Sequence, residues 1–185
     1  LPTQLQLVRW NEDIVHHRRI KFKIVDLLKC LPEQGHPMDA LQAAVAALGM
    51  FYPGRNVQDI ENNYWSTVRL VAKLPTIVAA WARLRQGNEY IPPRDDLGFS
   101  ENFLYMLTET ERLPLWGNIF DDCLVLHAEH TMNASTFTGM ITASTLADPY
   151  TVVASSIGAL KGPLHGGANE EVVQMLKEIG EPRRV

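Results

Sequence analysis

The residues best suited to chemistry form a short run near the end of the chain. His165 lies in the run Gly-Pro-Leu-His-Gly-Gly-Ala-Asn at residues 162–169. The glycines leave the backbone around the ring bare, so another molecule can approach it closely. The next residues predict a helix, with Asn169 as its N-cap, acidic side chains in its first turn and Gly180 at its end. We therefore expect His165 just before the positive end of a helix dipole.

This position favours a neutral imidazole over an imidazolium, because the positive end of a helix disfavours added positive charge. A neutral ring can donate a hydrogen bond to a carbonyl oxygen without carrying charge. Free amides at the helix start would also bind an anion by donating hydrogen bonds to it. The run thus suits a carbonyl or carboxylate ligand. The alternative is a Gly-Pro turn between two helices on which His165 is merely exposed.

A second polar cluster, His-Ala-Glu-His at residues 127–130, ends an apolar helical pattern. His127 and His130 are three residues apart and share one helix face, so they could bind a metal. A catalytic metal site needs a third ligand, however, and the sequence nominates none, so we expect no metal. For His127 we favour a structural role with its ring bonded to backbone. His130, where the helix gives way to a polar segment, is better placed to face a ligand.

Helical signals also dominate the rest of the chain, and no convincing strand pattern occurs. Thr3 and Gln6 form a capping-box pattern, Asp148 and Pro149 predict the start of another helix, and Pro75 predicts a kink. Small residues at 39–48 and 133–147 indicate helices that pack at short range. Before the helix that follows Asn169, the predicted helices span roughly 4–19, 22–31, 37–48, 57–86, 99–107, 113–130 and 149–162. The fold class is therefore all-α.

Composition excludes several classes of protein. The 185 residues fit one domain, and the net charge of −4 gives no case for nucleic acid. No apolar run is long enough to span a membrane, and the first residues lack a secretory signal. We interpret Cys30 and Cys123 as buried thiols in a reducing, cytoplasmic compartment. The glycosylation pattern Asn-Ala-Ser at 133–135 is interpreted as accidental. The basic run 16–19 is interpreted as a solvated helix end.

Several blocks, in this order, resemble the citrate synthase family, which includes the 2-methylcitrate synthases. The resemblance is strongest in three blocks: residues 127–130, the small-residue helix with Asp-Pro-Tyr after it, and residues 162–169. Three earlier blocks look like bacterial and archaeal members: His-Pro-Met-Asp at 36–39, Lys-Leu-Pro-Thr-Ile at 73–77 and Glu-Asn-Phe-Leu-Tyr-Met-Leu at 101–107. The resemblance covers essentially the whole chain.

The resemblance implies a helical enzyme that condenses acetyl-CoA, as co-substrate, with oxaloacetate, and that holds no permanently bound cofactor. In this family the histidine matching His165 hydrogen-bonds the thioester carbonyl as the enol forms, and the histidine matching His130 binds oxaloacetate. Members are homodimers in which each active site receives a residue from the partner. We expect the same here, and larger homo-oligomers remain open.

Family members are roughly twice this length. By resemblance, residues 1–185 are the central part of the large helical domain, truncated at both ends, without the small domain. The absent part would carry another catalytic histidine, the aspartate that abstracts the acetyl proton, the carboxylate-binding arginines and most coenzyme A contacts. We therefore expect these residues alone to be inactive. Three alternatives stay open: a 2-methylcitrate synthase that uses propionyl-CoA, a non-catalytic helical assembly module, and a His-x-x-His metal protein.

Overall fold

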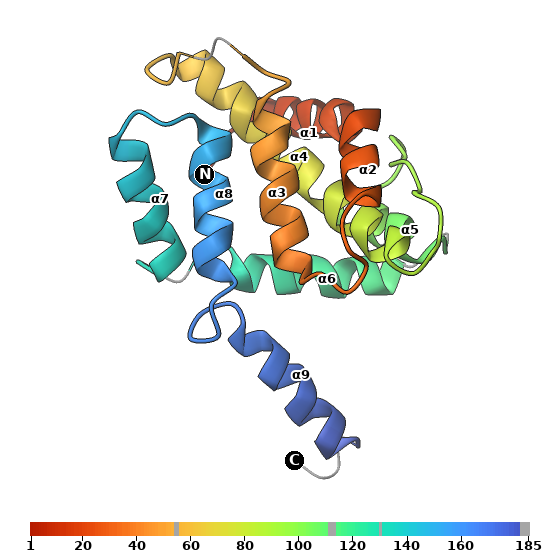
Figure 1. Cartoon of the computed structure of the whole chain (residues 1–185). Coiled ribbons are helices and arrows are strands. Elements are labelled where there is room, and N and C mark those ends of the chain that lie inside the picture. The colour runs from red at the N-terminus through yellow and green to blue at the C-terminus, as the bar shows by residue number, and fades with distance from the viewer. Residues whose placement is uncertain (54–55, 111–113, 130, 182–185) are drawn as a thin grey trace.

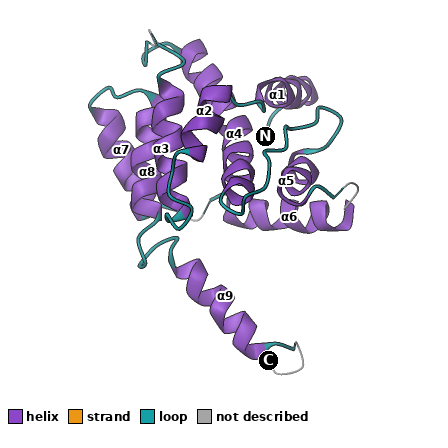
Figure 2. Ribbon diagram, turned by 45° about the vertical axis from the view of Figure 1, so that its right-hand side comes forward, coloured by secondary structure: helices purple, strands orange, loops and turns teal. Residues whose placement is uncertain are grey.

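The computed structural model describes residues 1–53, 56–110, 114–129 and 131–181, and within them the chain is helical with no strand (Figures 1 and 2). The all-α prediction is confirmed. In chain order, these helices are α1 (Gln4–His17), α2 (Phe22–Lys29), α3 (Pro37–Gly49), α4 (Ile60–Leu84), α5 (Phe99–Thr108), α6 (Pro114–His127), α7 (Ala134–Ser144), α8 (Pro149–Leu160) and α9 (Ala168–Ile179).

Local capping signals set most helix ends. The Thr3 hydroxyl accepts from the Gln6 amide at 3.3 Å, and the Gln6 side chain accepts from the Thr3 amide at 2.8 Å, which completes the predicted capping box. The Asp148 carboxylate accepts from two amides in the first turn of α8. α4 is one helix through Pro75. The kink that Pro75 predicts stays a prediction.

The main core lies between α2, α3, α4 and α8. α3 and α8 run side by side (Figure 1), and the predicted close approach of the alanine-rich helix is confirmed. Ala40 and Ala44 are buried, and a Cβ added at Gly158 of α8 would lie 2.7 Å from the Gln42 side chain. The buried core residues are Ile24, Leu28, Ala40, Ala44, Val45, Leu48, Leu70, Ile77, Ala80, Trp81, Tyr150, Ala154 and Ile157.

The small-residue helix α7 packs against α8. A Cβ added at Gly139 would lie 2.7 Å from the Ser156 hydroxyl, so a larger residue would force the Ser156 side chain to move. α7 also exposes the large apolar side chains of Phe137, Met140 and Ile141. α9 projects away from the other helices (Figures 1 and 2), and its apolar side chains are exposed as well.

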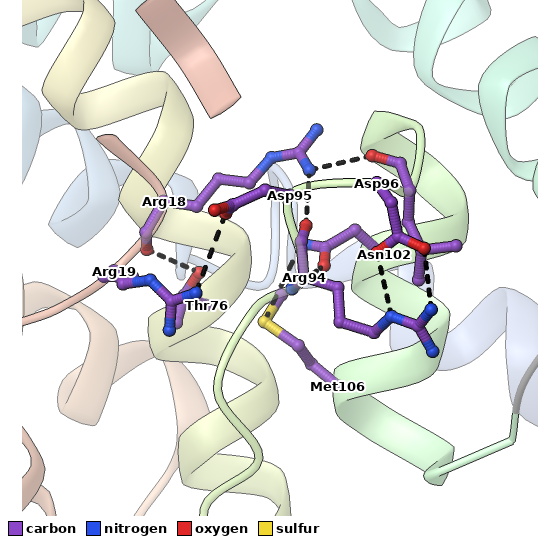
Figure 3. Close-up of polar contacts among 9 residues, drawn as sticks. Arg18, Arg19, Thr76, Arg94, Asp95, Asp96, Asn102 and Met106 are labelled. Carbon is purple, nitrogen blue, oxygen red and sulfur yellow. Dashed lines mark hydrogen bonds and ion pairs between the residues drawn. The ribbon is translucent and has the colours of Figure 1, made fainter. Parts of the chain in front are cut away.

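The basic run at the end of α1 is only partly solvated. His16 and Arg19 are exposed, as predicted, but Arg18 is only 4% exposed, so for this residue the prediction was wrong. The Arg18 guanidinium donates to the Arg94 carbonyl at 3.0 Å and the Leu97 carbonyl at 2.8 Å, which ties the loop before α5 to the end of α1 (Figure 3). These partners lie more than 75 residues away, so no local pattern could indicate them.

Lys73 of α4 is also buried, at 4% exposure. Its ammonium donates to the carbonyls of His17 and Arg19, where α1 ends. Burial is the main cause that lowers the Lys73 pKa from 10.5 to about 8, and the positive charges of Lys21 and Arg69 lower it further. The lysine thus provides hydrogen-bond donors for carbonyls at the end of α1. Burial of its positive charge, however, lowers the stability of the fold.

This cost predicts a pH dependence of stability. Between about pH 8 and pH 10.5 the unfolded chain holds the Lys73 proton more tightly than the folded chain, so the free energy of unfolding rises with pH. From about pH 7 to about pH 9 we expect Lys73 to contribute a rise of about 1 kcal/mol. Urea denaturation at both pH values measures it. Lys73→Met should lack this part of the rise, whereas Lys29→Met, at an exposed position, should keep it; identical pH dependence in both variants would contradict the assignment.

Cys30 and Cys123 are free thiols, and both are exposed. The prediction that they are buried was wrong. Cys30 follows the last residue of α2, beyond the core-facing part of that helix, and Cys123 lies in the part of α6, residues 121–127, in which every residue is exposed. In the described part of the chain, no helix is both long enough and apolar enough to cross a bilayer.

Candidate active site

The site is built on the turn between α8 and α9, which carries His165. The His165 and Gly167 amides both donate to the Gly162 carbonyl, at 2.9 and 3.2 Å, so the turn folds back on its own start. α9 then begins at Ala168 with Gly167 as its N-cap. The prediction that Asn169 is the N-cap was wrong, because the turn runs directly into the helix and leaves Asn169 inside the first turn.

The first amides of α9 are not free for an anion. The amides of Ala168, Asn169 and Glu170 donate at 3.1 to 3.2 Å to the carbonyls of the three residues from His165 to Gly167. The expected anion site made by these amides is therefore absent from the described structure. The dipole of α9 still places its positive end three residues after His165.

The glycines of the turn make room for the chain itself rather than for a ligand. A Cβ added at Gly166 would lie 2.6 Å from both the carbonyl oxygen and a methyl carbon of Leu160. A Cβ at Gly167 would lie 2.8 Å from the carbonyl oxygens of Lys161 and Gly162. Backbone cannot yield to such contacts as a flexible side chain can. The glycines next to His165 are thus required to bring the turn against the end of α8.

Gly166→Ala should therefore displace His165. A misplacement of about 1 Å can cost about 10²-fold in rate, so in a polypeptide of the length of the family members, which the resemblance implies to be active, we expect kcat to fall by about this factor. Steady-state kinetics measures the effect. Gly98→Ala is the matched control, because the nearest atom to its added Cβ is a side-chain oxygen at 3.7 Å. Equal rates in both variants would contradict the account of the turn.

The His165 ring is half-buried against the first turn of α7. Its Nε2 atom lies 2.9 Å from the Ser135 hydroxyl oxygen and 3.4 Å from the Ser135 amide nitrogen. Asn133 caps α7 and accepts from the Thr136 amide at 2.7 Å and from the Ser135 hydroxyl at 2.6 Å. The ring therefore lies beside the start of α7, and α9 begins three residues after it in the sequence.

Sequence reasoning missed Ser135. It lies 30 residues before His165, and only the packing of α7 on α8 brings the two together. The Asn-Ala-Ser pattern was visible, but it was interpreted as an accidental glycosylation signal. The spacing of Asn133 and Thr136 in front of a small-residue helix would have indicated an N-cap instead.

Two polar contacts tie this turn to the start of α3. Nδ1 of His36 accepts from the Met38 amide at 3.1 Å, so its Nε2 carries the proton and donates to Glu170 at 3.2 Å. At the other side of the turn, the Lys161 ammonium lies 2.7 Å from both oxygens of Asp39. Sequence reasoning missed these partners too, since they join residues more than 120 positions apart.

The structure tests only one of the paired histidines. Nδ1 of His127 lies 2.7 Å from the Cys123 carbonyl oxygen, which can only accept, so the ring donates to backbone. This bond agrees with the structural role predicted for His127, although the ring is exposed. His130 lies outside the described residues. Among the residues that are described, no three His, Cys, Asp or Glu side chains are grouped so that they could hold a metal ion.

Comparisons with known proteins agree on one family. The family model "Citrate synthase, C-terminal domain" matches residues 1–185. The citrate synthase of Synechocystis sp. is 57% identical over 185 residues, which are 100% of this chain and 47% of that protein. The citrate synthase of Acidithiobacillus ferridurans is 47% identical over 190 residues, with 100% and 49% covered. The crystal structure of citrate synthase from Pyrobaculum aerophilum has a TM-score of 0.88 and 42% identity, with 100% and 48% covered. The chain thus spans about half the length of these relatives.

Proposed function

The chain belongs to the citrate synthase family, and on this premise we propose that it is part of an enzyme that condenses acetyl-CoA with oxaloacetate to give citrate and CoA. The observation that carries the proposal is the position of His165, beside the first turn of α7 and three residues before α9. We infer a neutral ring there, because the positive end of α7 lies beside it. A neutral imidazole can donate a hydrogen bond to an oxygen that gains negative charge.

In the proposed reaction, a general base removes a proton from the acetyl methyl group, and the electron pair moves onto the thioester oxygen. His165 stabilises this oxygen as a preorganised hydrogen-bond donor. The enol carbon then forms a bond with the ketone carbon of oxaloacetate, and hydrolysis of the thioester releases CoA. No carboxylate of the described residues hydrogen-bonds to or pairs with His165. The family aspartate that abstracts the acetyl proton matches none of the described residues, so we assign the general base to none of them.

We assign oxaloacetate binding to His130, since it is the second histidine of the His-x-x-His pair. We define the family-length enzyme as a polypeptide of the relatives' length that contains these residues. In this enzyme His130→Ala should weaken oxaloacetate binding by about 10-fold or more, because a hydrogen bond to a charged ligand contributes about 1.5–3 kcal/mol. Calorimetric titration with oxaloacetate measures the change. His127→Gln, which alters the neighbouring exposed ring, should bind nearly as wild type; unchanged affinity in His130→Ala would remove this residue from the site.

We further propose that residues 1–185 are the central part of the large helical domain of a cytoplasmic homodimer, with a larger homo-oligomer still open. The exposed apolar side chains of α7, namely Phe137, Met140 and Ile141, support a subunit contact on that helix. The two free cysteines support a reducing compartment. Sedimentation of the family-length enzyme tests the assembly, and a monomer would count against it.

One assay tests the function. The family-length enzyme should release CoA from acetyl-CoA in the presence of oxaloacetate and yield citrate. A higher kcat/KM with propionyl-CoA would instead identify a 2-methylcitrate synthase. If the enzyme consumes neither thioester and does not bind oxaloacetate, the chain is a non-catalytic assembly module.

A further inference from the structure

The turn that carries His165 is tied at its start to the first turn of α3. Lys161 is the C-cap of α8, and its ammonium lies 2.7 Å from both carboxylate oxygens of Asp39. Asp39 lies in the first turn of α3. Both charges have the favourable sign, because an acidic side chain stabilises a helix start and a basic one stabilises a helix end. This ion pair therefore holds the start of the turn against α3.

The far side of the turn is tied to the same helix start by His36. This residue is the N-cap of α3, and its Nδ1 atom accepts from the Met38 amide at 3.1 Å. The bond leaves the proton of the neutral ring on Nε2, which lies 3.2 Å from a carboxylate oxygen of Glu170. Glu170 lies in the first turn of α9. The His36 ring therefore caps α3 and donates to the start of α9 at the same time.

The two helices joined in this way differ in how they are held. α3 contributes Ala40, Ala44, Val45 and Leu48 to the main core, whereas no residue of α9 is buried and the helix projects from the others (Figure 1). An exposed ion pair contributes little to global stability. Local opening of a turn breaks few contacts, however, so the same free energy can control it. The start of α3 thus provides a fixed support for a turn that precedes an unpacked helix.

We propose, on the basis of the proposed function, that Asp39 and His36 are positioning residues for His165. They hold the two sides of its turn against α3, and they act through this turn, because the ring itself is bonded to Ser135. Loss of either contact lets the turn open and moves the ring away from the oxygen that it stabilises. The start of α3 therefore affects the rate of the reaction and not the binding of oxaloacetate.

Charge reversal tests the contact at the start of the turn. Lys161→Glu places two carboxylates against each other, so hydrogen exchange of the His165 and Gly167 amides, which both donate within the turn, should become about fivefold faster. We expect kcat to fall by about the same factor, with KM for oxaloacetate unchanged. The double variant Asp39→Lys/Lys161→Glu restores the attraction and should recover most of both losses. Recovery is incomplete because each charge then has the unfavourable sign for its helix end.

A conservative pair of variants tests the contact at the far side. Glu170→Gln keeps an oxygen that accepts from His36 Nε2, so this variant should retain most of the exchange protection and most of kcat. Glu170→Ala removes the acceptor, and both quantities should fall by about twofold to fivefold. Arg19→Glu is the matched control, because it places a carboxylate against Asp95, which lies 3.8 Å from Arg19 (Figure 3). That contact joins the end of α1 to the loop before α5, so neither quantity should change.

The experiment is hydrogen exchange of the family-length enzyme, measured by mass spectrometry on peptides that span residues 161–170, together with steady-state kinetics. Urea denaturation checks that each variant is folded. If Lys161→Glu keeps wild-type exchange, or if the double variant recovers nothing, the role of Asp39 is overturned while the proposed function stands. Faster exchange with wild-type kcat would likewise overturn it, since the turn would then open without effect on the reaction. If wild type forms no citrate, it is the proposed function that fails, whatever the exchange rates are.

Discussion

His165→Ala in the family-length enzyme should lower kcat by about 10²–10³-fold, the usual cost of losing one preorganised donor to a developing oxyanion. The ring is held by the turn from Gly162 to Gly167 and by Ser135, so it is already oriented before substrate binds. The interaction strengthens only as the thioester oxygen gains charge. We therefore expect the loss in kcat and not in oxaloacetate affinity.

His16→Ala is the matched control for this variant. His16 is exposed on α1, and its Nδ1 atom lies 2.7 Å from the Glu12 carbonyl oxygen, so it is bonded to backbone and lies outside the site. This variant should keep wild-type kcat. A His165→Ala enzyme with wild-type kcat would show that this residue takes no part in the reaction. A change confined to oxaloacetate binding would show that the residue acts on oxaloacetate and not on the thioester.

The second large effect concerns the 185 residues as an isolated polypeptide, which should form no measurable citrate. Proton abstraction requires a base within hydrogen-bond reach of the acetyl group. The ring hydrogen bonds of His165 are with Ser135 and not with a carboxylate, and the chain spans about half of its relatives. In addition, α9 leaves Val172, Val173, Met175 and Leu176 exposed, so the helix that follows His165 is not held by packing.

An assay with acetyl-CoA and oxaloacetate measures this loss, and the family-length enzyme serves as its positive control. Circular dichroism must show helix in the isolated polypeptide, so that inactivity reflects missing groups and not unfolding. Citrate formation above the rate without protein would contradict the prediction and would place a general base within residues 1–185.

Features encoded locally were predictable from the sequence. The capping box at Thr3, the cap at Asp148 and the helix end at Gly180 depend on residues one to four positions apart, and all three were correct. The position of His165 before a helix was correct for the same reason. The start of α9 was misplaced by two residues, because a turn that bonds directly into a helix gives no cap signal in the sequence.

Features that depend on tertiary contacts were not predictable. The burial of Arg18 depends on carbonyls in the loop before α5, and the burial of Lys73 depends on carbonyls at the end of α1. Within the site, Ser135 reaches His165 only because α7 folds back along α8. A single sequence contains the residue types for these contacts but not the distances between them.

The charge on the His165 ring tests the central claim most directly. It can be measured by ¹⁵N NMR of the family-length enzyme at neutral pH, with oxaloacetate and an unreactive acetyl-CoA analogue bound. We expect a neutral ring with one protonated nitrogen. An imidazolium, with protons on both nitrogens, would contradict the claim that an uncharged donor stabilises the enol.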